Sequence, residues 1–341
     1  MALLAGAALI ALGAAGYAPQ ARADTYRLTA ETSEATSRTK AGVRFGELFE
    51  QETNGEHKVR VFPNAQLTGG DQIKQAEFVG RGDLDFVVTS AITVSPLVPE
   101  MSVFSLPYLY ANYDEVDATL NGKPAERMAE IMAEHGIVIL GWGESGFREV
   151  TNNVKPITGP DDLKGLKMRV AGPMFIDIMT ALGANPQQMQ WSETFGALQQ
   201  GVVDGQENPI GAVIIPQRVY EVQKYLTAWH YSYDPAFLAV SKKLWDSWDE
   251  DTRQKARKAA EQAMNEQKEA TREQTADGIA FLKDQGMVIH EPGAEEIDAY
   301  RKATQSAFDK WADRVGDDLV GLFKSTIKES GGTSDGQVSA N

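Results

Sequence analysis

Gly165-Leu166-Lys167-Met168-Arg169-Val170 is the first of two motifs around which this 341-residue chain is organised. It places Arg169 inside a short apolar run with strand character. An arginine keeps its positive charge, and burying an unpaired charge is costly. Arg169 therefore needs a partner, which is either a protein carboxylate such as Asp161 or Asp162 or a bound anion.

The second motif is Gly196-Ala197-Leu198-Gln199-Gln200-Gly201-Val202-Val203-Asp204-Gly205-Gln206-Glu207-Asn208-Pro209. It predicts a helix over Ser192–Gly201 and a strand over Val202–Gln206, because a glycine commonly ends a helix and β-branched residues favour strands. A polar turn follows and stops at Pro209. The motif therefore delivers Asn208 at the end of a strand.

Strands and helices are expected to alternate on both sides of this region. In the N-terminal part the pattern is β-α-β-α-β, which predicts a largely parallel sheet with helices on both faces. Ligands bind beyond the carboxyl ends of the strands in such sheets, here near Glu31, Pro63 and Thr89-Ser90. The expected strands are 26–30, 58–62 and 84–88, and the expected helices are a segment from about Ala41 to Gly55 and 72–79.

The middle of the chain predicts a strand at Phe104–Tyr108, a helix at Tyr113–His135 and a strand at Ile137–Trp142. The pattern restarts at Phe147–Asn153, where a second lobe is expected to begin. That lobe continues with a strand at 166–170 and a helix at 174–182. Residues 249–285 contain no proline and predict a helix of about 55 Å at 1.5 Å per residue, long enough to cross two lobes.

The composition limits which classes of protein are possible. A length of 341 residues with 42% hydrophobic residues suits two α/β lobes better than one ordinary domain. The formal net charge of −15 argues against nucleic acid or an anionic membrane surface as a partner. Local positive charge must therefore hold any anionic ligand. Cysteine is absent, which excludes thiolate catalysis and cysteine-based metal sites.

The first 23 residues predict an export signal. Leu3–Gly16 is almost wholly apolar, and Ala21-Arg22-Ala23 fits a small-residue cleavage site before Asp24, although no basic residue precedes the run. A membrane anchor is not expected, because a span needs about 18 or more apolar residues. Cleavage removes Arg22 and leaves 32 basic and 48 acidic residues, a net charge of −16. The polar tail 331–341 is expected to be disordered.

Four further segments accompany the two motifs: Pro63–Leu67, Gly82–Phe86, Phe104–Tyr108 and Tyr220–Lys224. With them, the chain from about Asp24 to Ser330 resembles the DctP-like family, the periplasmic solute-binding proteins of TRAP (tripartite ATP-independent periplasmic) transporters. The resemblance implies an α/β periplasmic binding protein fold of two lobes, each with a mixed, mostly parallel sheet flanked by helices. A long helix spans both lobes.

The resemblance also implies a domain division and partners. The first lobe is expected to comprise residues 24–146 with about 235–275, and the second residues 147–234 with about 276–330. The protein is expected to be a periplasmic, monomeric receptor without cofactor, metal, nucleic acid or stable membrane insertion. It would bind a small organic acid through its carboxylate and deliver it to the small and large membrane subunits of the permease. The solute itself stays open among C4-dicarboxylates, sugar acids, keto acids, sialic acid and ectoine-like compounds.

The expected site residues follow from the matched motifs. In the family the arginine corresponding to Arg169 grips the solute carboxylate, the asparagine corresponding to Asn208 assists it, and an arginine at the position of Arg148 adds a second contact in many members. Trp191 is expected to stack on the ligand. The remaining candidates are Glu207 beside Asn208, Glu31, Thr89 and Ser90 in the first lobe, and Tyr231 and Phe237 near the hinge.

Each of these residues also has a structural interpretation. An arginine beside a glutamate, such as Arg148 in Gly146-Phe147-Arg148-Glu149, is usually part of a solvated pair worth little, and an aromatic residue such as Trp191 usually belongs to a core. Lone Glu and Ser residues usually face solvent. A carboxylate at Glu31 would suit a ligand carrying hydroxyls or an amine at the end away from its own carboxylate.

Two other functions remain as alternatives. A periplasmic hydrolase or lyase acting on an organic acid is the main one, but no Gly-x-Ser-x-Gly elbow or phosphate-binding glycine loop is present. The four histidines, His57, His135, His230 and His290, show no metal-ligand spacing. The other alternative is a sensory module that presents solute to a receptor, which the sequence does not separate from transport.

Overall fold

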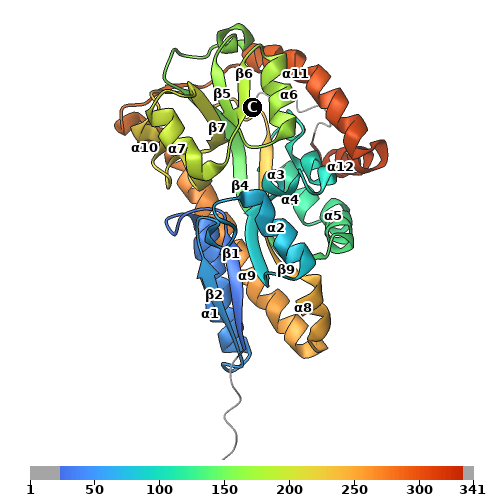
Figure 1. Cartoon of the computed structure of the whole chain (residues 1–341). Coiled ribbons are helices and arrows are strands. Elements are labelled where there is room, and N and C mark those ends of the chain that lie inside the picture. The colour runs from blue at the N-terminus through green and yellow to red at the C-terminus, as the bar shows by residue number, and fades with distance from the viewer. Residues whose placement is uncertain (1–23, 333–341) are drawn as a thin grey trace, which may run out of the picture.

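The computed structural model describes residues 24–332 (Figure 1). The expected export signal, residues 1–23, lies outside the described residues, as do residues 333–341 of the expected tail. Within the described part, one sheet of ten strands runs through both lobes in the order β2-β1-β3-β9-β4-β7-β5-β6, with β8 and β10 off this path. No helix of this part combines the length and apolarity that crossing a membrane requires.

The first lobe is built around three parallel strands and matches the predicted β-α-β-α-β order. Strand β1 (Asp24–Ala30) lies between β2 (His57–Phe62) and β3 (Phe86–Ser90), and the chain passes between them through α1 (Ser37–Glu52) and α2 (Gln72–Arg81). Asp71 caps α2 by accepting from the N–H groups of Ile73 and Lys74 at 3.1 and 3.2 Å. Leu28, Phe45 and Phe49 are buried in the core between α1 and the strands.

The second lobe repeats this arrangement. Strand β5 (Lys167–Val170) pairs in parallel with β6 (Asn185–Gln188) and β7 (Gly205–Pro209), and α6 (Pro173–Ala181) and α7 (Trp191–Gln199) connect them. The strand expected at Val202–Gln206 begins three residues later, because Gly201–Asp204 form the turn after α7. Strand β6 was not predicted, since a polar segment containing Pro186 lacks the usual strand pattern. Short strands β8 (Tyr225–Thr227) and β10 (Val288–His290) extend this lobe.

Two long antiparallel strands join the lobes. Strand β4 (Ile137–Asn152) pairs with β9 (Tyr233–Ser241) and then continues into the second lobe beside β7 and β8. The prediction of a strand that ends at Trp142 was therefore wrong. The register shifts between Glu144 and Gly146, where Gly146 has φ +114°, a backbone conformation that favours glycine. These glycine-rich positions hid the continuity of the strand.

The longest helix of the described chain lies behind the sheet and contacts both lobes (Figure 1). Helix α9 (Glu250–Ala276) packs on α1, on β4 and on the helical turn Ile210–Ile214 (η4). It was predicted as one helix to Gln285, but Asp277 separates it from α10 (Gly278–Asp284). A Cβ on Gly278 would lie 2.4 Å from Cγ2 of Ile210, so this close contact requires glycine.

Two other predictions were wrong. Phe104–Tyr108 is not a strand, because its apolar residues belong to the 3₁₀ helix Pro99–Ser105 (η2) and the turn after it. They are buried on all sides, which produces a continuous apolar run like that of a buried strand. The helix predicted at 113–135 is divided into α4 (Tyr113–Leu120) and α5 (Lys123–Glu134). Gly122 and Pro124 mark the break between them.

The remaining helices complete the fold. Helix α3 (Ala91–Val94) follows β3, α8 (Lys242–Ser247) follows β9, and α11 (Ala294–Val315) covers α6 and η2. Helix α12 (Asp317–Glu329) packs on α4 and α5. It thereby contacts segments that the predicted domain division assigns to the other lobe. That division stays a prediction, and its boundary after residue 146 falls inside the continuous strand β4.

Candidate ligand-binding site

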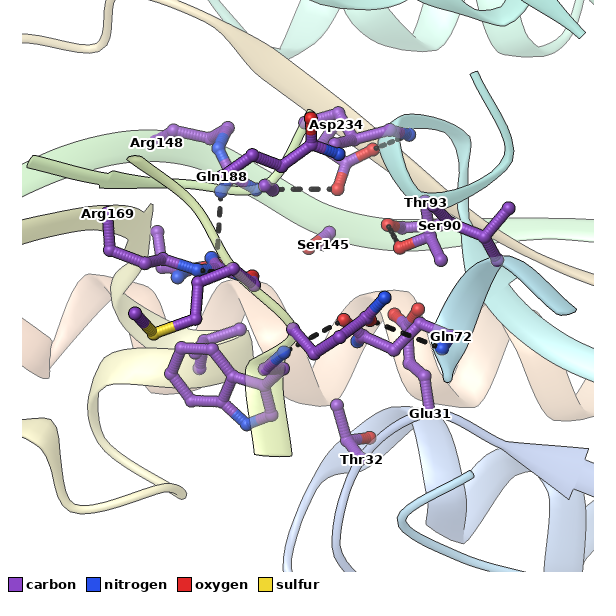
Figure 2. A pocket seen from close by; sticks show the side chains of 18 of the residues that line it. Glu31, Thr32, Gln72, Ser90, Thr93, Ser145, Arg148, Arg169, Gln188 and Asp234 are labelled. Atoms are coloured by element: carbon purple, nitrogen blue, oxygen red, sulfur yellow. Dashed lines mark hydrogen bonds and ion pairs between the residues drawn. The ribbon is translucent and has the colours of Figure 1, made fainter. Parts of the chain in front are cut away.

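A cavity of about 380 Å³ lies between the lobes at the carboxyl ends of β3 and β5. Its size is typical of a small-molecule site. Figure 2 shows Arg148 and Arg169 on one side, Glu31, Ser90 and Thr93 on the other, and Ser145 between them. The lining is mostly polar and consists of Glu31, Thr32, Arg38, Gln72, Ile73, Ser90, Ile92, Thr93, Ser145, Arg148, Arg169, Ala171, Gln188, Met189, Gln190, Trp191, Glu193, Asn208, Val213 and Asp234.

Arg169 is a buried cation without a carboxylate partner among the described residues. It lies on β5 with 2% of its surface exposed, and its Nε and Nη2 donate to the carbonyl oxygen of Met189 at 3.0 and 2.8 Å. Nη1 donates to no group of the described chain. Burial lowers the pKa of Arg169 to about 10, so the side chain is still protonated at neutral pH. The cavity side of Arg169 thus presents a positive charge that no carboxylate contacts directly, although the carboxylates of Glu207 and Glu31 act on it from a distance.

The structural alternative for Arg169 does not hold. Asp161 pairs with Lys164 at 2.8 Å. Asp162 accepts from Lys155 at 3.2 Å and from the backbone and hydroxyl of Thr158 at 3.0 Å. Both aspartates are therefore used elsewhere, and neither compensates the guanidinium of Arg169.

Arg148, in contrast, is neutralised by the protein. On β4, its Nε and Nη2 donate to the carboxylate of Glu207, and Nη2 also donates to Oδ1 of Asn208 at 3.2 Å. Asp234 lies 3.6 Å from Nη1. Burial opposes the charged form, but the carboxylate of Glu207 outweighs it and raises the pKa of Arg148 above its usual value. Arg148 lines the cavity as one member of a buried ion-pair network, not as the solvated pair that its sequence context favours.

The two candidate residues on β7, Glu207 and Asn208, have different positions relative to the cavity. Asn208 lines the cavity, and its Nδ2 donates to Oε1 of Gln206 at 2.5 Å. Glu207 does not line the cavity. It lies behind it, where it holds Arg148 and accepts from the hydroxyl of Tyr231 at 2.8 Å. The motif therefore supplies one residue that faces the cavity and one that supports it.

The first-lobe candidates form a second buried pair. Glu31 follows β1 and pairs with Arg38 at the start of α1. Thr89 donates to Oε2 of Glu31 at 2.9 Å but does not line the cavity, whereas Glu31 and Ser90 do. Arg38 was not among the sequence candidates, because the polar stretch around it predicts a solvated helix start. Its Nε is buried and has no partner in the described chain.

Ser145 and Asp234 are also cavity residues that the sequence did not indicate. The Ser145 hydroxyl is buried without a hydrogen-bond partner among the described residues. Asp234 accepts from the N–H of Ile92 at 3.1 Å, and burial raises its pKa to about 6. Ser145 adjoins Gly146 and Asp234 adjoins Pro235, both at the irregular crossing of β4 and β9. That irregularity is the only signal that marked them.

Of the three aromatic candidates, one lines the cavity and two do not. Trp191 lines the cavity, and the Arg169 guanidinium lies 5.4 Å from the centre of its ring. Tyr231 and Phe237 do not line the cavity. Tyr231 is buried behind Glu207, and Phe237 packs against Trp142 with ring centres 5.7 Å apart. Both side chains belong to the hydrophobic core, Tyr231 just before β9 and Phe237 within it.

The cavity contains no recognisable catalytic arrangement in the described residues. None of the four histidines lines it. Within residues 24–332, no group of three or more His, Cys, Asp or Glu side chains is placed to hold a metal ion. The chemistry that the arrangement supports is the reversible binding of an anion by Arg169, assisted by hydrogen bonds from neutral polar groups.

Comparison with known proteins indicates the class of protein. A sequence profile described as "Bacterial extracellular solute-binding protein, family 7" (DctP) matches residues 28–314. The C4-dicarboxylate-binding periplasmic protein DctP of Rhodobacter capsulatus is 32% identical over 297 residues, which cover 86% of this chain and 88% of that protein.

Solved structures agree in fold. A TRAP periplasmic solute-binding protein from Ralstonia eutropha H16 with bound (S)-2-acetolactate has a TM-score of 0.87 and 35% identity, covering 89% of this chain and 99% of that one. A TRAP protein from Polaromonas sp. JS666 bound to D-erythronate has a TM-score of 0.82 and 30% identity, covering 88% and 97%. These similar proteins are receptors for small organic acids.

Proposed function

Because the chain belongs to family 7 of the bacterial extracellular solute-binding proteins, we propose that it captures a small organic acid for a TRAP transporter, holding the acid by its carboxylate on Arg169. The ligand lies in the cavity between the lobes and contacts both of them. Its delivery to the membrane subunits of the permease, and export to the periplasm through residues 1–23, are parts of the same proposal. The sensory role remains a variant of it, in which the partner is a receptor.

One observation carries the proposal. Arg169 is buried at the cavity wall, keeps its charge, and has only the carbonyl oxygen of Met189 as an acceptor in the described chain. An uncompensated buried charge is unfavourable, and a ligand carboxylate relieves it with a charge-assisted hydrogen bond. The same geometry therefore favours an anion over a neutral solute.

Substrate turnover finds no support in the site. A hydrolase or lyase needs a positioned nucleophile or a pair of acid and base groups near the bound acid. In this cavity the carboxylates of Glu31 and Asp234 are paired with arginines instead. The proteins that match in sequence and structure are receptors as well.

The test begins with a thermal-shift screen of organic acids, because a ligand at 100 times its Kd stabilises the folded state by about 2.7 kcal/mol. A hit should bind at 1:1 stoichiometry in calorimetry and be recovered unchanged. Arg169→Lys should weaken it by roughly 10- to 100-fold, because the planar fork and one charge-assisted bond are lost.

The matched control is Arg127→Lys, since Arg127 forms an exposed pair with Glu130 away from the cavity. That variant should bind like the wild type. Affinity of Arg169→Lys within twofold of the wild type would refute the assignment of Arg169. A ligand whose neutral amide binds as tightly as the acid would refute carboxylate recognition as a whole.

A further inference from the structure

Buried arginines and buried carboxylates occur in equal number around the cavity. Three buried arginines lie at its wall: Arg38, Arg148 and Arg169. Three buried carboxylates lie at the wall or directly behind it: Glu31, Glu207 and Asp234. Glu193 also lines the cavity, but it is exposed and its charge is solvated. The pairing of these six buried groups determines what charge a ligand must carry.

Two of the arginines are already neutralised. Arg38 is paired with Glu31, which also accepts from Thr89 at 2.9 Å. Arg148 is paired with Glu207 and lies 3.6 Å from Asp234. A second ligand carboxylate placed near either arginine would face a protein carboxylate at the same time. Bringing two like charges together in a poorly solvated site is strongly unfavourable.

Arg169 is therefore the one buried cation of the described cavity wall that lacks a carboxylate. Asp234 and Glu31, in turn, are not free anions that could hold a ligand ammonium group, because each already lies beside an arginine. A cationic ligand end would have to compete with Arg38 or Arg148 for them. Among its buried groups, the described wall thus offers one cation that no carboxylate contacts and no carboxylate that lies apart from an arginine.

The rest of the wall is polar but neutral. The Ser90 and Thr93 hydroxyls lie 3.2 Å apart opposite Arg169 (Figure 2). The Ser145 hydroxyl and the Nε of Arg38 are buried without partners in the described chain. A buried polar group without a partner costs free energy. The Arg38 Nε–H therefore favours a ligand group that accepts, and the Ser145 hydroxyl favours one that accepts or donates. A hydroxyl group meets both requirements.

From this balance we propose that the site is selective for hydroxylated monocarboxylates, with the carboxylate on Arg169 and the hydroxyls toward Ser90, Ser145 and the Arg38–Glu31 pair. The proposal rests on the proposed function and narrows its solute class. It excludes C4-dicarboxylates as the preferred solutes, although the matching relative from Rhodobacter capsulatus is named for them. The Arg38–Glu31 pair is the element that sets this selectivity.

A series of four-carbon probes tests the proposal by calorimetry at pH 7.5. D-Erythronate carries one carboxylate and hydroxyls, succinate two carboxylates, butyrate one carboxylate without hydroxyls, 4-aminobutyrate an added ammonium, and erythritol hydroxyls without a carboxylate. D-Erythronate should bind at least tenfold tighter than each of the others. The same order should hold for six carbons, with D-gluconate binding tighter than adipate.

The Glu31→Gln variant tests the mechanism of selectivity. It keeps the size of the side chain but leaves Arg38 without its carboxylate, so the preference for D-erythronate over succinate should fall by about tenfold. The control Glu130→Gln removes a glutamate that pairs with an arginine outside the cavity, and its preference should match the wild type. If Glu31→Gln does not fold, the comparison of probes on the wild type still decides the selectivity.

The outcomes separate this inference from the proposed function. Succinate and adipate binding as tightly as the hydroxylated acids would overturn the inference and leave carboxylate recognition intact. Tighter binding of 4-aminobutyrate would overturn it in favour of a zwitterion. If erythritol binds as tightly as D-erythronate, or if no acid binds, the proposed function itself is wrong. The proposed selectivity is then wrong as well, because it rests on that function.

Discussion

The backbone N–H of Trp191 donates to Oε1 of Gln72 over 3.1 Å, and this bond connects the second lobe to the first. The backbone N–H of Gln72 in turn donates to Oε1 of Gln190 over 3.3 Å. Gln72 is the first residue of α2 and Trp191 the first residue of α7. The two helix starts thus meet at the cavity, which describes a closed arrangement of the lobes.

Replacing Gln72 should favour the open arrangement. Gln72→Ala removes the side-chain bond to Trp191, and one such bond contributes about 0.5–1.5 kcal/mol. Ligand dissociation should therefore become roughly 2- to 10-fold faster, measured by stopped-flow fluorescence of the tryptophans. Small-angle scattering should show a larger radius of gyration for the variant at sub-saturating ligand. Lys74→Ala, in the exposed part of the same helix, is the control, and equal rates for both variants would contradict this role of Gln72.

Arg169 should lower the stability of the protein in the absence of ligand. Its desolvated charge has no carboxylate in direct contact in the described chain. Arg169→Met therefore removes an unfavourable term while keeping an unbranched side chain. The free energy of unfolding without ligand should be equal to or higher than that of the wild type. The stabilisation by ligand should disappear. Urea unfolding with and without ligand measures both, and a loss of more than about 1 kcal/mol without ligand would show that Arg169 is a structural residue.

Glu207 should be important for stability although it does not line the cavity. Glu207→Ala leaves the buried guanidinium of Arg148 without its main partner and the hydroxyl of Tyr231 without its acceptor. Breaking a buried ion pair in this way costs about 3–5 kcal/mol, which urea unfolding would detect. Glu47→Ala is the control, because its 3.5 Å pair with Arg44 is exposed and should change stability by less than about 0.5 kcal/mol. A similar small effect at Glu207 would refute the network.

The raised pKa of Asp234 predicts that the free energy of unfolding decreases as the pH rises. Burial raises its folded-state pKa to about 6 from 3.8, although Arg148 and Arg38 oppose the rise and Glu31 adds to it. The folded state therefore binds the proton more tightly than the unfolded chain does. This contribution to stability is complete below about pH 4 and is lost as the pH rises through 6, a change of about 3 kcal/mol.

Asp234→Asn should remove that contribution, because asparagine does not titrate and can still accept from Ile92. The stability of the variant relative to the wild type should therefore increase by about 2–3 kcal/mol between pH 4 and pH 7. Urea unfolding at four pH values measures this difference, and other titrating groups cancel between the two proteins. A difference that is constant with pH would mean that Asp234 ionises normally.

Local patterns were sufficient where an element has one buried face. The alternation of strands and helices in residues 24–90 and the position of β5 followed from apolar periodicity, prolines and glycines. Segments buried on every side were misread, as at Phe104–Tyr108, because periodicity vanishes when no face is exposed to water. The strand β4 was predicted too short, because it too is buried along nearly its whole length and its glycines interrupt the strand pattern.

The sequence alone indicated the family through its motifs, and the resemblance implied the two-lobe α/β class. A local apolar pattern placed Arg169 on a buried strand. Only the tertiary structure decided which arginine is free. Arg38, Arg148 and Arg169 are the same chemical group, and they differ in the carboxylates that distant segments bring to them. Glu31 neutralises the first and Glu207 the second. Arg169 has no carboxylate in contact among the described residues, because Asp161 and Asp162, the nearest acidic residues before it in the sequence, pair with lysines instead.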